Sequence, residues 1–401
     1  MATDPLSGLT RNWVLPEYVE DVLPAEAARV ERLRRLLLDH FVVHGYGLVM
    51  PPMIEYTESL LTGTGHDLDL RTFKLVDQLT GRMLGVRADI TPQVARIDAH
   101  LLNCAGVTRL AYCGTVLHAL PPPMSSSREL LQIGAELFGH AGVDSDIEIQ
   151  RLMLDALRLA GASGVHLDLG HVGLFRALCR HGGVDAVLEG ALFQALQGKD
   201  LPTLRSLTRG LATVTREAVL RLPELFGGIE VIDRGREVLP AYPEVVTCLG
   251  QLQRIGEALA SRVDALLIDL AELRGYHYHS GVVFAAYVPG SANALARGGR
   301  YDQVGRAFGR ARPATGFSLD LRELAAVVAG EAAPPPIHAP YPEDARLLRV
   351  IEELRGRGEV VVVALPGEQA QADAGPQPPR RLCLEDGEWR VVSGDASPTD
   401  N

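Results

Sequence analysis

Two groups of strand-like segments stand on either side of a long helical stretch, and this order restricts the folds open to the chain. The alternating apolar runs TRLAYCGTVLHAL and ELLQIGAELFG precede the helical stretch at about 171–262, and VDALLIDLAEL and PATGFSLDL follow it. Strands and helices that are segregated in this way are typical of α+β proteins. We therefore expect an α+β fold, in which an antiparallel sheet is flanked by helices and carries a helical insertion.

Shorter patterns place the remaining elements and the domain boundaries. Residues 24–46 have apolar side chains at helical spacing, and Thr80-Gly81 is a turn signal between two apolar runs, which predicts a hairpin. The proline-then-serine stretch PPPMSSS predicts an exposed, mobile loop. We expect a main domain over 1–325, a proline-rich linker over 326–344 and a small α/β C-terminal module over 345–401.

Composition and charge exclude several classes of protein. The net charge is −11, whereas proteins that bind nucleic acid usually carry a basic face that displaces counterions from phosphates. No apolar run approaches the roughly 20 residues of a membrane span, and the start of the chain lacks a secretory signal pattern. Five scattered cysteines without a CxxC pair favour a reducing cytoplasm. We expect no nucleic-acid partner and no membrane partner.

The stretch RGYHYHSGVVF, residues 274–284, combines an arginine with tyrosines and histidines in what we interpret as a strand. On a strand, His277 and His279 would share one face, a spacing that suits metal ligands. No third ligand pattern lies nearby. The stretch therefore predicts the wall of a small-molecule pocket, and we expect neither a metal ion nor a cofactor.

Seven ordered segments resemble the catalytic domain of histidyl-tRNA synthetases in sequence and spacing. They cover roughly residues 12–325 and are LPEYVEDVLP, HGYGLVMPPMIEY, VRADITP, LQIGAELFG, LRGYHYHSGVVF, ARGGRYDQVGRAFG and ATGFSLDLREL. The segment RGYHYHSG is similar to the histidine-binding signature RGLDYYTG of that family. The resemblance implies a class II aminoacyl-tRNA synthetase-like antiparallel sheet flanked by helices, in a protein that is usually dimeric.

The positions that carry adenylation chemistry in the synthetases hold other residues here. That chemistry brings a carboxylate against the phosphates of ATP, and the family neutralises the charge with one arginine in motif 2 and one in motif 3. In alignment, these arginines fall on His118 and Glu323, and the motif 2 glutamate and a motif 3 glycine fall on Leu120 and Asp320. The displaced Arg322 would face another way on a helix.

This loss of positive charge has a large energetic consequence. One unit charge at about 4 Å contributes about 1 kcal/mol in water and about 4 kcal/mol at a surface-like dielectric. Two lost cations and two gained anions amount to a penalty on the order of 10 kcal/mol, which would abolish adenylation. We therefore expect the chain not to be an enzyme.

The amino-acid pocket of the family retains complementary groups in this sequence. The synthetases hold the ammonium group of histidine with carboxylate and amide groups, and its carboxylate with the signature arginine. The resemblance implies that the histidine-binding residues here are Asp89, Thr91, Gln132, Glu136, Arg274, Tyr278 and Tyr301. Asp89 is shorter than the glutamate of the family, and His279 replaces a tyrosine of the imidazole site.

The C-terminal region is also unlike that of a synthetase. Only 71 residues follow Gly330 (401 − 330), whereas an anticodon-binding domain is usually an α/β module of about 100 residues. A synthetase-like domain with these losses is similar to the regulatory subunit family of ATP phosphoribosyltransferase. That resemblance implies a non-catalytic cytoplasmic subunit, required by the short-form catalytic subunit in the first step of L-histidine biosynthesis and involved in feedback inhibition by histidine.

The same resemblance implies a hetero-octamer with the catalytic subunit, with self-association of this chain as a dimer. Two alternatives remain open: a divergent histidine-activating ligase that does not act on tRNA, and a free-standing histidine sensor. Individual residues also have plainer explanations. Arg274 suits a structural ion pair, Asp89 and Glu136 suit solvated strand ends, and Tyr301 suits the core. The arginines of residues 305–313 suit either a solvated loop or a contact with phosphate or a partner.

Overall fold

The computed structural model describes residues 14–63, 66–121, 127–328, 334–343, 345–368 and 380–393. Most of the predicted PPPMSSS loop, residues 122–126, lies outside this set. The chain divides into two compact units, Met1–Gly330 and Glu331–Asn401. The first unit contains all the residues for which a binding role is predicted.

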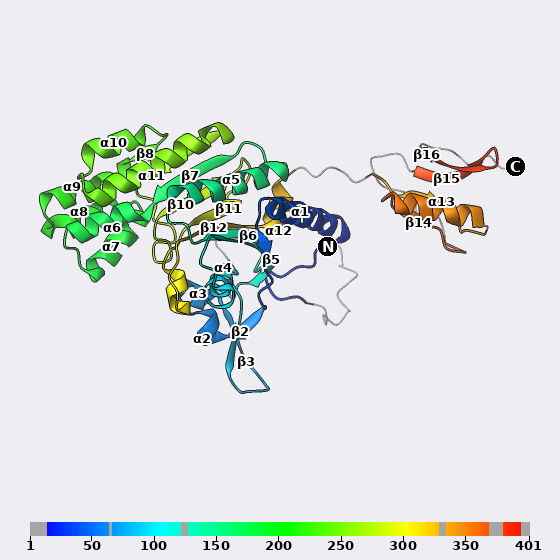
Figure 1. Ribbon diagram of the computed structural model, residues 1–401, viewed down its shortest axis with the longest axis horizontal. Coiled ribbons are helices and arrows are strands. Elements are labelled where there is room, and N and C mark those ends of the chain that lie inside the picture. Colours follow the sequence, from blue (N-terminus) through cyan, green and yellow to red (C-terminus); the bar gives the residue numbers. More distant parts are fainter. Residues whose placement is uncertain are drawn as a thin grey trace, which may run out of the picture. The chain divides into compact units, whose positions relative to one another are not determined.

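A nine-stranded sheet forms the centre of the first unit (Figure 1). Its order is β1 (Gly47–Leu48), β5 (Thr108–Leu117), β6 (Glu129–Phe138), β12 (Ala314–Asp320), β11 (Ala296–Arg300), β10 (Val282–Tyr287), β7 (His166–His171), β9 (Ala265–Asp269) and β8 (Phe226–Gly227). The six strands from β5 to β7 in this order are antiparallel, as predicted. The pairs β1–β5 and β7–β9 are parallel, because long crossover connections separate their members in sequence.

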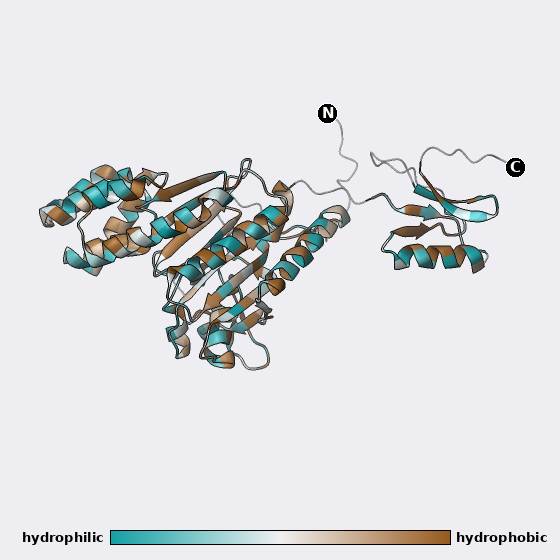
Figure 2. Cartoon of the chain, turned by 45° about the horizontal axis from the view of Figure 1, so that its top comes forward, coloured by the Kyte–Doolittle hydropathy of each residue, from teal (hydrophilic) through white to brown (hydrophobic). Residues whose placement is uncertain are grey.

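Helices cover one face of this sheet and bury its apolar side chains. They include α1 (Pro24–Val43), α5 (Val143–Leu159) and α12 (Leu321–Val327). The segment predicted as a helical insertion contains α6 (Val172–His181), α7 (Ala186–Gln197), α8 (Leu201–Leu207), α9 (Thr213–Arg221), α10 (Val231–Val238) and α11 (Pro243–Leu259). Figure 2 shows apolar residues concentrated in the strands and on the inner sides of the helices. No helix in the described part of the chain is both long enough and apolar enough to cross a membrane.

Shorter elements cover the opposite face of the sheet. A three-stranded antiparallel sheet has the order β2 (Ile54–Tyr56), β4 (Met83–Val86) and β3 (Phe73–Val76), and β3 with β4 is the predicted hairpin. It is accompanied by α2 (Thr57–Leu60), α3 (His66–Arg71) and α4 (Thr91–Arg96). The run LVMPPMIEY supplies strands to two different sheets, since its two prolines separate β1 from β2.

The prediction that residues 274–281 form a strand is wrong, because they make a turn that leads into β10. Gly275 has φ +64°, in the left-handed region that favours glycine. Its carbonyl oxygen accepts hydrogen bonds from the backbone N–H groups of Tyr278 and His279, each at 2.8 Å. The two histidines therefore do not share a strand face: His277 packs against Phe193, with ring centroids 5.2 Å apart.

The arginine-rich loop at 305–313 is tied to the fold at two points. The Arg312 guanidinium donates to buried Asp98 at 2.7 Å, and Arg312 is itself buried. Arg310 donates to the side-chain oxygen of Asn103 at 2.6 Å. Arg312 is therefore a structural residue, not a solvated one.

The second unit is a small α/β module with its own core. Its sheet has the order β14 (Val361–Val363), β13 (Ile337–Ala339), β15 (Arg380–Glu385) and β16 (Glu388–Ser393), and it is packed by α13 (Ala345–Gly356). Strand β13 lies inside the stretch predicted as linker, 326–344, because IHA is a short apolar strand between prolines. The module therefore begins before residue 345.

Candidate functional site

Six of the seven predicted pocket residues come together on the sheet face opposite α1 and α5. Asp89 and Thr91 lie where the chain enters α4, Gln132 and Glu136 extend from β6, and Tyr301 follows β11. Tyr278 reaches the same place from the turn before β10. The antiparallel register explains the convergence, because β6 and β11 both pair with the central strand β12. We call these six residues the pocket cluster.

Hydrogen bonds fix the acidic end of the pocket cluster. The side-chain amide of Gln132 donates to Asp89 Oδ1 at 2.9 Å, and the backbone N–H of Thr91 donates to the same oxygen at 3.0 Å. The Gln132 Oε1 in turn accepts the backbone N–H of Ile90 at 3.0 Å. Asp89 Oδ2 accepts no hydrogen bond from the described residues, so this oxygen is available to a ligand cation.

Glu136 lies at the buried centre of the pocket cluster. Its Oε1 accepts the Tyr112 hydroxyl at 3.1 Å, and its Oε2 accepts the Tyr301 hydroxyl. A side chain at Gly316 on β12 would overlap this carboxylate, so only glycine permits the approach. Burial raises the pKa of Glu136 to about 8, although the hydrogen bonds from Tyr301 and Tyr112 lower it. The carboxyl group is therefore mostly protonated at neutral pH.

Tyr112 belongs to this network but was not predicted from the sequence. Its hydroxyl lies 3.0 Å from the Thr91 hydroxyl as well as within reach of Glu136. In the run LAYCG the tyrosine is surrounded by apolar residues and looks like core. Strand alternation is the signal that could have identified it. Tyr112 pairs with Gly134, which is two residues from both Gln132 and Glu136, so all three side chains point to the same face of the sheet.

Tyr278 and His279 close the pocket cluster on the side of the turn. The Tyr278 ring stacks on Tyr301 with centroids 5.1 Å apart, and its buried hydroxyl has no hydrogen-bond partner among the described residues. His279 Nδ1 is likewise buried without a partner. Burial lowers the pKa of His279 to about 4, so its ring is neutral at pH 7. The Tyr278 hydroxyl can therefore take a hydrogen-bond partner such as a polar ligand, whereas His279 Nδ1 faces the backbone of the turn at Gly275.

Arg274, the seventh predicted residue, lies outside the pocket cluster. Its backbone N–H and its guanidinium donate to the two carboxylate oxygens of Glu272, at 2.7 and 3.2 Å, and its side chain is 44% exposed. Burial lowers the pKa of Arg274, but Glu272, Tyr287 and Asp168 raise it by a larger amount. The plainer explanation, a structural ion pair, fits this arginine as it stands.

The positions aligned with adenylation residues carry no free cation. His118 Nε2 is 2.9 Å from the Ala88 carbonyl oxygen, and burial lowers the pKa of this ring. Asp320 caps α12: its Oδ1 lies 3.1 Å from the backbone nitrogens of both Leu131 and Arg322. The Arg322 guanidinium donates to the Glu129 carbonyl oxygen and to Glu20, away from Glu323.

Glu323, in the first turn of α12, interacts electrostatically with Arg297 on β11. The amide of Asn293 lies 3.5 Å from its carboxylate. Burial raises the pKa of Glu323, and Arg297 acts in the opposite direction. Burial also raises the pKa of Asp320 to about 6.

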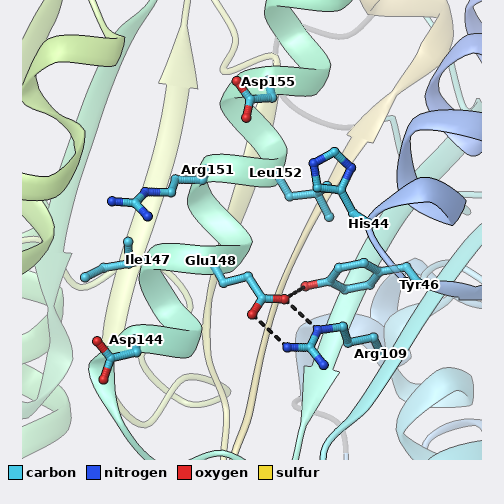
Figure 3. Close-up of a pocket in the computed structure, with 10 residues that line it drawn as sticks. His44, Tyr46, Arg109, Asp144, Ile147, Glu148, Arg151, Leu152 and Asp155 are labelled. Carbon is cyan, nitrogen blue, oxygen red and sulfur yellow. Dashed lines mark hydrogen bonds and ion pairs between the residues drawn. The ribbon is translucent and has the colours of Figure 1, made fainter.

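A separate hollow of about 630 Å³ lies on the helical face of the sheet, between α5 and the segment after α1 (Figure 3). At its floor Arg109 and Tyr46 both bind Glu148, at 2.7 and 2.9 Å. None of the predicted pocket residues lines it. The hollow is lined mainly by charged side chains of the helical face, and we do not assign the amino-acid site to it.

Known proteins resemble both units of this chain. A histidyl-tRNA synthetase family model matches residues 18–324, and a model of the ATP phosphoribosyltransferase subunit HisZ C-terminal domain matches residues 334–392. An ATP phosphoribosyltransferase regulatory subunit of Ralstonia pickettii is 56% identical over 386 residues, 96% of this chain and 99% of the relative. The chain belongs to the family of ATP phosphoribosyltransferase regulatory subunits. The regulatory subunit of Nitrosospira multiformis, 54% identical over 95% of this chain and 98% of its own, agrees.

Solved structures place the regulatory subunit family among class II synthetase folds. A protein of Bacillus halodurans described as an ATP phosphoribosyltransferase regulatory subunit/histidyl-tRNA synthetase has a TM-score of 0.79 and 27% identity, and the match covers 90% of this chain and 95% of the other. The histidyl-tRNA synthetase of Nostoc sp. PCC 7120 has a TM-score of 0.76 at 16% identity, covers 96% and 97% of the two chains, and supports the fold alone. The predicted fold class and family are thus confirmed.

Proposed function

We propose that this regulatory subunit is itself non-catalytic, binds L-histidine in the pocket cluster and transmits its presence to the short-form catalytic subunit. The observation that carries this proposal is the pocket cluster itself. Acidic and amide oxygens at Asp89 and Gln132 suit an ammonium group, while the unpaired Tyr278 hydroxyl suits an imidazole nitrogen.

The neighbouring acids argue against ATP activation at this site. Asp320 and Glu323 occupy the positions aligned with a glycine and an arginine of the synthetases, and Arg322 is directed elsewhere. A triphosphate placed here would face carboxylates without a compensating arginine from either motif. We propose that the adenylation function is absent and that the chain acts in the cytoplasm as a sensor and scaffold.

The regulatory role requires that binding of histidine be coupled to the active site of the partner. Such coupling is typically 1–3 kcal/mol and is reciprocal between the two sites. We propose a hetero-octamer in which this chain forms dimers, as the family resemblance implies.

Isothermal titration of the chain with L-histidine tests the binding step, and mass measurement with and without the short catalytic subunit tests assembly. Saturable binding and a mixed complex are expected. If the chain does not bind histidine, the pocket assignment is wrong, whereas histidine-dependent exchange of pyrophosphate into ATP would favour the ligase alternative.

A further inference from the structure

Arg297 is an arginine on the pocket side of the sheet that the sequence comparison with synthetases did not single out. Side chains alternate along β11, and Arg300 points to the helical face, where it donates to Asp146 on α5 at 3.0 Å. Arg297 lies three positions earlier and therefore points to the other face, the face on which Tyr301 meets Glu136.

The strand register places Arg297 between the pocket cluster and Arg274. One row of paired residues crosses this face from β5 to β7, with one residue on each successive strand. Its members are Tyr112, Gly134, Ser318, Arg297, Ala285 and Asp168. Neighbouring strands are about 4.8 Å apart, so Arg297 lies about two strands from the floor of the cluster on β6. Arg274 interacts with Asp168 and Tyr287, which lie beyond Arg297 on β7 and β10.

Arg297 also differs from Arg274 in its contacts. Its guanidinium makes no hydrogen bond or ion pair with a described residue and is exposed, whereas Arg274 is held by Glu272. Although the residue is exposed, partial desolvation of its side chain against the sheet lowers the pKa of Arg297, and the nearby charge of Arg274 lowers it further. Tyr287 and Glu323 act in the opposite direction. A bound anion would stabilise these two neighbouring guanidinium groups.

We propose that Arg297 binds the carboxylate of the amino acid held by the pocket cluster. This inference rests on the proposed function, because it names the residue that would hold the acidic end of the same ligand. Asp89 and Gln132 would hold the ammonium group, and the guanidinium of Arg297, on the same face of the sheet, has no partner among the described residues and is free to take the carboxylate. Arg274 then contributes charge from farther away, and its own ion pair with Glu272 persists.

Two ligands separate the role of the carboxylate from a general effect on the pocket. L-histidine carries the carboxylate, whereas histamine has the same imidazole and ammonium groups without it. Isothermal titration of the full chain should show Arg297→Ala weakening L-histidine binding by about tenfold to a hundredfold, the contribution expected of a charge-assisted hydrogen bond. The same substitution should leave histamine binding within about twofold of the unsubstituted chain.

Three further variants sharpen the test. Arg297→Lys should bind L-histidine more tightly than Arg297→Ala does. Arg274→Ala should weaken L-histidine binding less than Arg297→Ala does. Arg151→Ala, on α5 at the other face of the sheet, should leave the affinity unchanged. If Arg297→Ala leaves the L-histidine affinity unaltered, or weakens both ligands equally, the role of Arg297 is overturned but the proposed function is not. Absence of histidine binding by the unsubstituted chain overturns the proposed function as well.

Discussion

The side-chain amide of Gln132 donates a hydrogen bond to Asp89 Oδ1 across 2.9 Å, and this bond joins the entry of α4 to strand β6. Because the Gln132 Oε1 also accepts the N–H of Ile90, the amide cannot rotate without losing both bonds. The two side chains are therefore held before any ligand arrives, which reduces the conformational entropy lost on binding.

The first prediction concerns the charge of Asp89. Asp89→Asn preserves the size of the side chain and an oxygen for the N–H of Thr91, but removes the negative charge that would face a ligand ammonium group. We expect at least tenfold weaker binding of L-histidine, measured by isothermal titration, with an unchanged circular dichroism spectrum. Asp144→Ala, an exposed site on α5, is the control. Equal affinity in Asp89→Asn would remove this carboxylate from the site.

The second prediction follows from the protonated state of Glu136. Its pKa is raised from 4.5 to about 8 in the fold, so the folded chain holds a proton that the unfolded chain releases. The contribution of this proton to the free energy of unfolding is complete below about pH 4.5, falls as the pH rises and is lost above about pH 8. Glu136→Gln stays neutral and should lack this decline, a difference on the order of a few kcal/mol in the free energy of unfolding.

Urea unfolding of both proteins at pH 5, 6.5 and 8 checks this prediction. The free energy of unfolding of the unsubstituted chain should fall relative to that of Glu136→Gln as the pH rises. Parallel pH profiles would mean that Glu136 is ionised in the fold. Buried His171, whose pKa burial lowers to about 4, titrates equally in both proteins and cancels in the comparison.

The fold was predictable from sequence where periodicity is strong, and the candidate site residues were predictable where they lie in motifs shared with the synthetases. The hairpin around Thr80-Gly81 and the long strands β5 and β6 follow from alternation and turn chemistry. The stretch 274–281 also alternates, yet Gly275 turns it, because a positive φ is not visible in a polar-apolar pattern. Tyr112 was missed since a buried tyrosine in an apolar strand looks like core.

Arg274 and Arg297 illustrate a second limit. A motif identifies the residue type at a position but does not show which neighbouring side chain that residue contacts. Arg274 pairs with Glu272, and Glu272 was not part of the motif. Strand register, which decides that Arg297 is nearer to the pocket cluster, depends on pairing between strands far apart in sequence.

The third prediction compares two ion pairs of helix α5. Asp146 binds Arg300 at 3.0 Å, and both side chains are buried, whereas Asp144 binds Arg254 at 2.8 Å with both exposed. Asp146→Ala takes from Arg300 its buried carboxylate partner and leaves only the half-buried Asp302 at 3.1 Å, so it should lower the free energy of unfolding by about 3 kcal/mol. Asp144→Ala should lower it by less than about 1 kcal/mol. Urea unfolding measures both, and similar losses would contradict the assignment of Arg300 as a buried structural residue.

The fourth prediction concerns adenylation, a reaction that we propose this chain does not catalyse. Neither the unsubstituted chain nor Glu323→Arg should catalyse histidine-dependent exchange of pyrophosphate into ATP, because His118 still stands in place of the motif 2 arginine and the Asp320 carboxylate remains near the introduced guanidinium. A histidyl-tRNA synthetase in the same assay is the positive control. Exchange by either protein would support the ligase alternative.

Reconstitution with the short-form catalytic subunit tests the central claim most directly. Formation of phosphoribosyl-ATP from ATP and phosphoribosyl pyrophosphate is measured for the catalytic subunit alone, for this chain alone and for the mixture, with and without L-histidine. We predict activity only in the mixture, inhibition by histidine, and weaker inhibition when the chain carries Asp89→Asn. A catalytic subunit that is equally active without this chain, or a mixture that remains inactive, would contradict the account.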